Sequence, residues 1–307
     1  MRLVQAKSSC QITILFIGLD DTLSFMDKLF IFLQHIVPQH LLSRCTGWLA
    51  ELEHPSWLKD WVIGLFIGRF KVDMSEAVEP DPKKYPNFNA FFTRPLKEGA
   101  RPVADADVVC PADGAISQLG DIIDGRIFQA KGQDYSCVEL LGGDPEWAAT
   151  FAGGSFATIY LSPRDYHRVH MPMAGKLLGT TYVPGDLYSV NGVTAENVER
   201  LFARNERMVC YFETAVGPMA MILVGAMVVA GIETVWSGQV APAPKTPTSV
   251  GFQHLPEAVA LEKGEEMGRF KLGSTVILLF PEGAVEWDGR YEAGAATRLG
   301  VSLADKA

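Results

Sequence analysis

Apolar residues recur at helical spacing along the first part of the chain. Between residues 24 and 36 they lie three or four positions apart, and Pro38 ends this segment because proline does not continue a helix. A second segment covers 39–52, and a third follows Pro55-Ser56, a typical helix start. The pattern predicts three amphipathic helices within 24–71. The apolar positions of the first and third are Phe25, Leu29, Phe32, Leu33, Ile36, Trp57, Trp61 and Leu65.

The tryptophan face of the third segment has two explanations. Trp57 and Trp61 have the basic residues Lys59, Arg69 and Lys71 close by. Amphipathic helices with tryptophan on one face and basic residues beside it lie in the interface of a membrane. Such faces can equally pack on the rest of the protein, so the pattern alone leaves both explanations open.

The pattern changes after residue 71. Proline-containing pairs mark a loop-rich connection over 81–95, and beyond Arg101 short β-rich apolar runs are separated by turn residues. Closely spaced runs of this kind favour an antiparallel sandwich or barrel over repeated βαβ units. We expect an α+β fold, with the amphipathic helices followed by a mainly antiparallel β-rich domain over 72–307. We also expect one short helix within 195–205 and a surface loop over 239–249. The β-rich runs are 108–110, 115–119, 126–130, 156–161, 208–213, 219–224, 227–234 and 275–280.

One uncharged run lies inside this β-rich part. Residues 215–232 hold no charged side chain, and a membrane-spanning helix needs about 20 apolar residues. Pro218 and several glycines interrupt the run. We therefore expect two buried strands joined at Gly225 rather than a spanning helix.

The composition is that of an ordinary globular protein. The 307 residues are 48% hydrophobic and 21% charged, which excludes a disordered, collagen-like or coiled-coil chain. The net charge of −9 argues against a nucleic-acid partner. This charge is unevenly divided, because residues 1–71 sum to +1 and residues 72–307 sum to −10.

The cysteines indicate a reducing environment. All five are widely spaced and no C-x-x-C motif occurs, so neither a disulfide framework nor a zinc site is expected. Within residues 1–23 a short apolar stretch is followed at once by Asp20 and Asp21, without a small-residue cleavage site. We expect a poorly ordered N-terminal extension here in preference to a cleaved secretion signal.

Three groups of residues are candidates for chemistry. His167 and His170, three positions apart in a polar segment between prolines, suit proton transfer near neutral pH. Asp113 stands in an Asp-Gly pair after an apolar strand and could orient a histidine, as the acid of a triad does. Ser274 follows Gly273 at the entrance of an apolar strand. A serine hydroxyl helped by a base can attack its own preceding peptide bond, and glycine lets it approach.

Each group also has an ordinary structural explanation. A pair of histidines is more often structural than catalytic, and no further Cys or His clusters with them to suggest zinc. An Asp-Gly pair usually forms a turn, and serine after glycine is common where a strand begins. Each group alone is therefore weak evidence for catalysis, and only their combination supports a catalytic function.

The candidate residues stand within a series of longer segments. In chain order, these segments are FNAFFTRPL (88–96), PADG (111–114), YLSPRDYHRVHMP (160–172), VPGDLYSVN (183–191), LFARNER (201–207) and GRFKLGST (268–275). In combination, they resemble the bacterial type of phosphatidylserine decarboxylase. The resemblance covers about residues 24–300; it is weakest over 239–258, and the family pattern does not require the extension before about residue 23.

The resemblance implies a proenzyme that cleaves itself between Gly273 and Ser274, into a β chain of residues 1–273 and an α chain of residues 274–307. Ser274 would attack the carbonyl group of Gly273. His170 would be the base and Asp113 would fix its tautomer, so that Asp113, His170 and Ser274 form the self-cleavage triad. Elimination and hydrolysis would convert Ser274 into a covalent pyruvoyl cofactor, and no metal is expected.

The second implied reaction is decarboxylation at the same position. The pyruvoyl carbonyl would form a Schiff base with the amine of phosphatidylserine and accept electrons as CO2 leaves. His167 would donate the proton that completes phosphatidylethanolamine, a product of phospholipid biosynthesis.

A lipid substrate favours the membrane explanation for the helices over 24–71. The implied partners are phosphatidylserine in the membrane, the α and β chains of one precursor, and a second copy in a homodimer. The implied location is peripheral, on the cytoplasmic face of the inner membrane.

Two other hypotheses are weaker. A pyruvoyl decarboxylase of a soluble amino acid would not need an amphipathic N-terminus, and vesicle flotation separates the two. A non-catalytic lipid-binding relative would not need the complete set of candidate residues: Asp113, His167, His170, Gly273 and Ser274.

Overall fold

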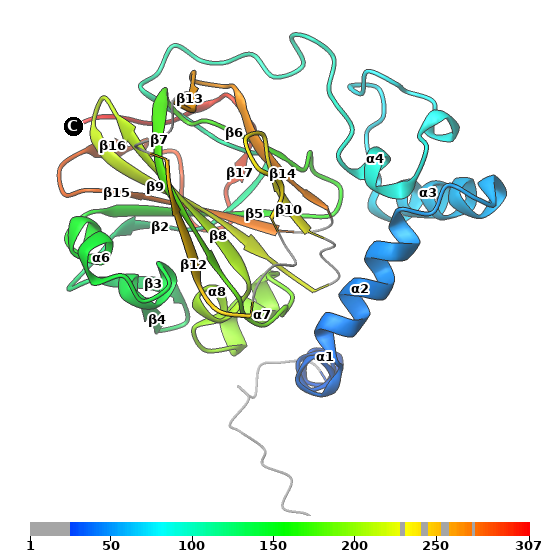
Figure 1. Ribbon diagram of the computed structural model, residues 1–307, viewed down its shortest axis with the longest axis horizontal. Coiled ribbons are helices and arrows are strands. Elements are labelled where there is room, and N and C mark those ends of the chain that lie inside the picture. The colour runs from blue at the N-terminus through cyan, green and yellow to red at the C-terminus, as the bar shows by residue number, and fades with distance from the viewer. Residues whose placement is uncertain (1–24, 228–230, 241–244, 253–257, 272–273) are drawn as a thin grey trace, which may run out of the picture.

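The architecture is α+β, with helices first and a mostly antiparallel β-rich body after them (Figure 1). The computed structural model describes residues 25–227, 231–240, 245–252, 258–271 and 274–307. The fold class predicted from the sequence is therefore confirmed. The expected N-terminal extension over 1–23 and the candidate residue Gly273 lie outside the described residues.

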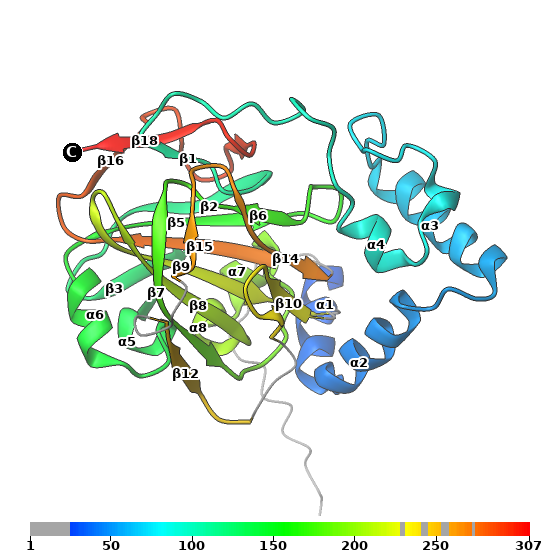
Figure 2. The ribbon, with the colours of Figure 1, turned by 45° about the horizontal axis from the view of Figure 1, so that its top comes forward.

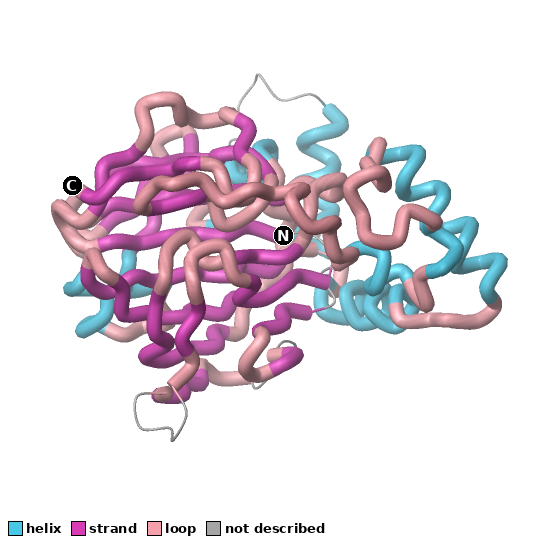
Figure 3. The backbone as a smooth tube through the Cα atoms, turned by 90° about the horizontal axis from the view of Figure 1, so that it is seen from above, coloured by secondary structure: helices cyan, strands magenta, loops and turns pink. Residues whose placement is uncertain are grey.

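The three N-terminal helices confirm the apolar spacing. They are α1 (Phe25–Ile36), α2 (Gln39–Ala50) and α3 (Ser56–Phe70), followed by a 3-10 turn at Pro82–Lys84 and the short helix α4 (Phe88–Phe92). Figures 1 and 3 show these helices along one side of the β-rich body. Over the residues described, no helix is long and apolar enough to cross a membrane.

Two different contacts hold these helices. The side chain of Gln34 in α1 accepts a hydrogen bond from the amide of Ser189 (2.8 Å), and His35 is hydrogen-bonded to the Tyr188 hydroxyl (3.0 Å). By contrast, α3 packs on α4 through a small apolar core of its own, formed by Ala50, Ile63, Val72, Tyr85, Phe88, Phe91 and Phe92. The large apolar residues on the other faces are left exposed, with Trp57 and Trp61 at 69% and 62%.

The body is built on one long sheet. Its described strands run in the order β12-β7-β8-β9-β15-β5-β2-β17, with β13 also paired to β7, and all these pairings are antiparallel. The uncharged run contributes β9 and, after it, β10, so its interpretation as two strands is confirmed for the described part. The strands of the long sheet are β2 (Gly114–Asp121), β5 (Ser155–Leu161), β7 (Gly175–Val183), β8 (Arg207–Thr214), β9 (Gly217–Gly225), β12 (Thr248–Gly251), β13 (Ala260–Leu261), β15 (Ser274–Phe280) and β17 (Ala296–Thr297).

The central strand β15 of the long sheet is buried on both faces, which explains why its sequence is a continuous apolar run. Val276 and Leu278 belong to one core, and Ile277 and Leu279 to the other. Smaller sheets cover the first face (Figure 2). Their strands are β1 (Val108–Val109), β18 (Ser302–Lys306) and β16 (Val285–Trp287) in one, and β11 (Gly238–Gln239), β10 (Gly231–Thr234), β14 (Glu266–Lys271) and β6 (Arg168–His170) in the other.

Short helices and a hairpin line the second face. Figures 1 and 2 both show them beneath the long sheet. They are α5 (Cys137–Leu140), α6 (Pro145–Phe151), α7 (Gly192–Asn197), α8 (Leu201–Arg204) and the hairpin of β3 (Arg126–Ala130) and β4 (Gln133–Ser136). The β-rich part is therefore a sandwich with a helical layer added on one side.

Two local predictions were wrong. The single helix expected within 195–205 is divided into α7 and α8, and Arg200 between them has a left-handed backbone with φ of 53°. The loop expected over 239–249 has a strand at each end, β11 and β12, while 241–244 lie outside the described residues. All residues of β12 are exposed, so this edge strand carries no apolar alternation that a sequence could display.

Candidate active site

The segment that joins β5 to β6 carries both candidate histidines. Asp165 closes its first turn by accepting hydrogen bonds from the amide and the hydroxyl of Ser162, both at 2.7 Å. His167 lies two residues after Asp165, and His170 is the last residue of β6. Strand β6 pairs with β14, where the amide of Phe270 donates to the carbonyl of His167 at 3.0 Å. The histidines are thus fixed by backbone pairing.

The ring of His167 is completely buried and neutral. It is 0% exposed, and its centroid lies 4.0 Å from that of Phe92 in α4. Burial lowers the pKa of His167 to about 3, although the hydrogen bond to the Asp165 carbonyl acts in the opposite direction. This bond joins Nδ1 to the carbonyl at 2.8 Å, which places the proton on Nδ1. The Nε2 lone pair then has no hydrogen-bond partner.

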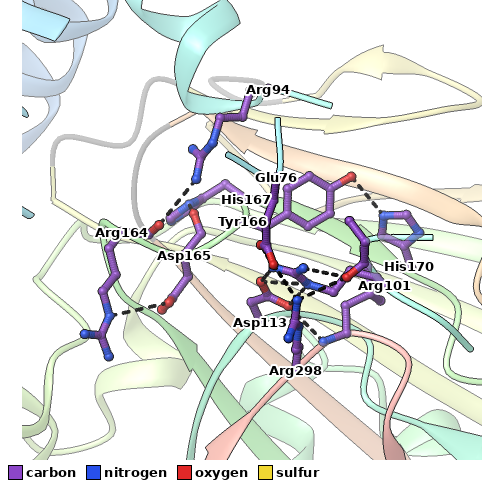
Figure 4. Close-up of polar contacts among 12 residues, drawn as sticks. Glu76, Arg94, Arg101, Asp113, Arg164, Asp165, Tyr166, His167, His170 and Arg298 are labelled. Carbon is purple, nitrogen blue, oxygen red and sulfur yellow. Dashed lines mark hydrogen bonds and ion pairs between the residues drawn. The ribbon is translucent and has the colours of Figure 1, made fainter. Parts of the chain in front are cut away.

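The ring of His170 is held in the same tautomer. Its Nδ1 donates to the carbonyl of Gly264 at 2.8 Å, and its Nε2 faces the hydroxyl of Tyr166 at 3.3 Å (Figure 4). Burial lowers the pKa of His170, while the Gly264 carbonyl and the charge of Glu266 raise it. A side chain at position 264 would not fit, because its Cβ would lie 2.5 Å from a methyl carbon of Val103. The ring therefore presents an unprotonated Nε2, as a general base must.

Ser274 begins the central strand β15. It pairs with Leu161 of β5 on one side and with Gly225 of β9 on the other. Its side chain is 0% exposed, and within the described part of the chain its hydroxyl oxygen has no hydrogen-bond partner. A buried polar atom without a partner is costly and calls for an explanation. Leu161 is also where the histidine segment departs from β5, so the topology brings Ser274 next to the start of that segment.

Asp113 lies at the entrance of β2, but it is not hydrogen-bonded to His170. Its carboxylate forms an ion pair with Arg101 at 2.6 Å and accepts the amide of Leu299 at 2.9 Å. The guanidinium is the stronger partner because the bond is charge-assisted. The expected role of Asp113 in fixing the tautomer of His170 is therefore filled by Gly264 in this structure. The negative charge of Asp113 still affects the site electrostatically, because it acts to raise the pKa of His167 and of His170.

The backbone at Asp113 is held close to β5. A Cβ at Gly114 would lie 2.2 Å from the carbonyl oxygen of Tyr160, so the Asp-Gly pair serves a close approach of two strands. A polar cavity of about 460 Å³ opens beside it, and its lining includes Arg101, Asp113, Arg164 and Asp165. The described residues include no cluster of three or more His, Cys, Asp or Glu suited to a metal ion.

Several residues of the site were not singled out from the sequence. Tyr166 and Gly264 contact His170, Phe92 covers His167, and Arg168 joins the segment to α4 by donating to the carbonyl of Thr93 at 2.9 Å. Phe92, Tyr166 and Arg168 do lie within segments 88–96 and 160–172 of the family resemblance. Gly264 has no sequence signal that links it to a histidine 94 positions away.

Comparison with known proteins agrees with this arrangement. A family model described as phosphatidylserine decarboxylase matches residues 88–304, and a second model, described as PSD, matches residues 29–71. Similar curated proteins, each called phosphatidylserine decarboxylase proenzyme, come from Alcanivorax borkumensis (56% identical over 90% of this chain and 96% of the relative), Pseudomonas aeruginosa strain LESB58 (57%, 92% and 98%) and Marinobacter nauticus (57%, 91% and 98%). The chain belongs to the phosphatidylserine decarboxylase family.

Proposed function

We propose that this chain is the proenzyme of a phosphatidylserine decarboxylase, which cleaves itself and then converts phosphatidylserine to phosphatidylethanolamine. The observation that carries the proposal is the family match over 88–304, which includes every candidate site residue. The buried hydroxyl of Ser274 supports it, because among the described residues no hydrogen bond holds this hydroxyl away from the carbonyl group of the preceding residue.

Self-cleavage uses groups of the chain and one water molecule. The hydroxyl oxygen of Ser274 attacks the carbonyl carbon of Gly273, and Nε2 of His170 takes the hydroxyl proton and passes it to the amine that is released. The peptide bond is thereby replaced by an ester. Loss of the Cα proton of residue 274 then breaks its Cβ–O bond, which gives a free carboxylate on Gly273 and dehydroalanine at 274. Addition of water and loss of ammonia leave a pyruvoyl group. The products are residues 1–273 and 274–307, held together by the pairing of β15 with β5 and β9.

The residues present fit a pyruvoyl group at position 274. Ser274 is fully buried, so a carbonyl formed there would be protected from bulk water. The pyruvoyl group supplies a carbonyl that bonds the substrate amine and takes up the electron pair left by CO2. Asp113 supports His170 through its charge, which favours the protonated ring once the hydroxyl proton has been taken.

The neutral state of His167 suits a second proton transfer. A substrate arrives with a protonated amine, which must lose a proton before it can react. The Nε2 of His167 has no hydrogen-bond partner among the described residues and is proposed to relay a proton to Cα after CO2 has left. A ring with a pKa of about 3 holds a proton only transiently and passes it readily to a carbanion. His167 is thus proposed for decarboxylation and His170 for self-cleavage.

The N-terminal helices are proposed to bind the membrane surface. Trp48, Trp57 and Trp61 are between 62% and 69% exposed, a costly arrangement in water that a lipid interface would relieve. An apolar cavity of about 450 Å³ lies between α2, α3 and α4, lined in part by Leu58 and Phe66. We place the enzyme peripherally on the cytoplasmic face of the inner membrane, and as a homodimer of processed protomers.

The test is release of CO2 from phosphatidylserine labelled in its carboxyl group. Wild-type protein should release label, and Ser274→Ala should release none. Thr275→Val is a matched control, because Thr275 is the next residue of β15 and also has a buried hydroxyl without a partner. It should remain active. Label released by Ser274→Ala at the wild-type rate would overturn the proposed function.

A further inference from the structure

Arg94 is a buried arginine whose charge has no carboxylate partner among the residues that the structure describes. It follows α4 and is only 3% exposed. Its one hydrogen bond goes to the carbonyl of Arg164 at 3.4 Å, its Nε has no partner at all, and no described carboxylate forms an ion pair with it. Its remaining close contact is with the ring of Phe91, 5.6 Å from the guanidinium carbon. A buried cation is costly unless it is paired and hydrogen-bonded.

A buried and a partly buried arginine of the same chain show which partners a structural arginine has. Arg207 is 2% exposed, and its guanidinium donates to four backbone carbonyls, those of Leu140, Ala203, Asn205 and Glu139. Arg101 has two carboxylates, Asp113 and Glu76. Arg94 has neither kind of partner, so packing does not explain it.

Arg94 lies in the candidate active site. Figure 4 shows its guanidinium directed at the segment of Arg164, Asp165 and His167. The residues before it in the chain also touch this segment, since Phe92 covers the ring of His167 and Thr93 accepts from Arg168. The positive charge of Arg94 contributes to lowering the pKa of His167. Buried atoms of this region without a hydrogen-bond partner among the described residues include the Nε of Arg94, the Nε2 of His167 and the hydroxyl oxygen of Ser274.

We infer that Arg94 binds the phosphodiester of the substrate headgroup, an inference that rests on the proposed function. An arginine fork suits an anionic oxygen pair, and the headgroup offers two anions, a carboxylate and a phosphodiester. The carboxylate loses its charge when it leaves as CO2, so an arginine bound to it would stabilise the reactant more than the transition state. The phosphodiester keeps its charge throughout, and binding it helps every state equally. Burial lowers the pKa of Arg94, and an anion would restore it.

Kinetics with two soluble substrates test this assignment. Glycerophosphoserine carries the phosphodiester, and O-methylserine has the same amine and carboxylate without it. Arg94→Met should raise KM for glycerophosphoserine about tenfold to a hundredfold with kcat nearly unchanged, and should not affect O-methylserine. Arg94→Lys should restore part of the binding. Arg126→Met, which removes an exposed arginine paired with Asp134, is the control and should match wild type.

The outcomes separate this inference from the proposed function. Equal losses on both substrates, or an unchanged KM for glycerophosphoserine, would overturn the role of Arg94 while leaving the enzyme a decarboxylase. If wild-type protein turns over neither substrate and also releases no label from phosphatidylserine, the proposed function fails. Calorimetric binding of glycerophosphoethanolamine then still decides whether Arg94 holds the phosphodiester, because Arg94→Met should abolish binding that Arg94→Lys keeps in part. Self-cleavage and circular dichroism show whether each variant folds.

Discussion

The buried neutral state of His167 predicts a specific sensitivity to acid. Burial lowers its pKa to about 3 in the folded protein, whereas the pKa of a histidine in an unfolded chain is about 6.5. Between these values the unfolded chain binds a proton that the folded chain does not, so stability falls as the pH falls below about 6.5. From pH 7 to pH 5 this one residue should lower the free energy of unfolding by about 2 kcal/mol.

The measurement is urea unfolding of the single-chain variant Ser274→Ala, followed by tryptophan fluorescence at pH 7 and pH 5. A second variant carries His167→Gln in addition, and the glutamine side chain is neutral at both pH values. The pH-dependent loss of stability should be about 2 kcal/mol smaller in the second variant, since contributions from other groups cancel in the comparison. His54→Gln, at an exposed position, is the control and should leave the loss unchanged. Equal losses with and without His167 would refute the argument that its ring is buried and neutral.

Three further predictions concern the other groups. His170→Ala should abolish self-cleavage, as seen on a denaturing gel, because Nε2 of this ring is the proposed base. Added imidazole should restore part of the cleavage. If the variant cleaves at the wild-type rate, another group must be the base. Asp113→Asn should slow self-cleavage and lower the free energy of unfolding by about 1–3 kcal/mol, because Arg101 loses a charged partner; normal stability in urea would contradict the ion pair. Replacing Trp57 and Trp61 together by Ser should weaken binding to anionic vesicles at least about tenfold in a flotation assay, with unchanged kcat on O-methylserine; undiminished flotation would remove the proposed membrane face.

Elements with a periodic or continuous apolar pattern could be predicted from the sequence. The spacing of Phe25, Leu29 and Phe32 predicted α1, and the apolar run 275–280 predicted the strand β15. Strand β12 could not be predicted, because all of its residues are exposed and only backbone pairing with β7 defines it. The division between α7 and α8 depends on one left-handed residue, Arg200, which ordinary helix propensity does not reveal.

The sequence allowed some of the site residues to be predicted, but it did not allow their contacts to be predicted. His167, His170, Ser274 and Asp113 were selected from their residue types and from the family resemblance. The partner of Asp113 is Arg101, and the partner of His170 is a backbone carbonyl at Gly264, which no side-chain pattern can display. The missing partner of Arg94 is likewise a property of the folded protein.

The most direct test of the account is the intact mass of denatured wild-type protein. The proposal predicts two chains, residues 1–273 and residues 274–307, with the smaller one lighter than its unmodified sequence by one ammonia and blocked to N-terminal sequencing. Ser274→Ala should give one chain of full length, and Thr275→Val should give the same two chains as wild type. An active wild-type protein that runs only as one unmodified chain of 307 residues would contradict the mechanism.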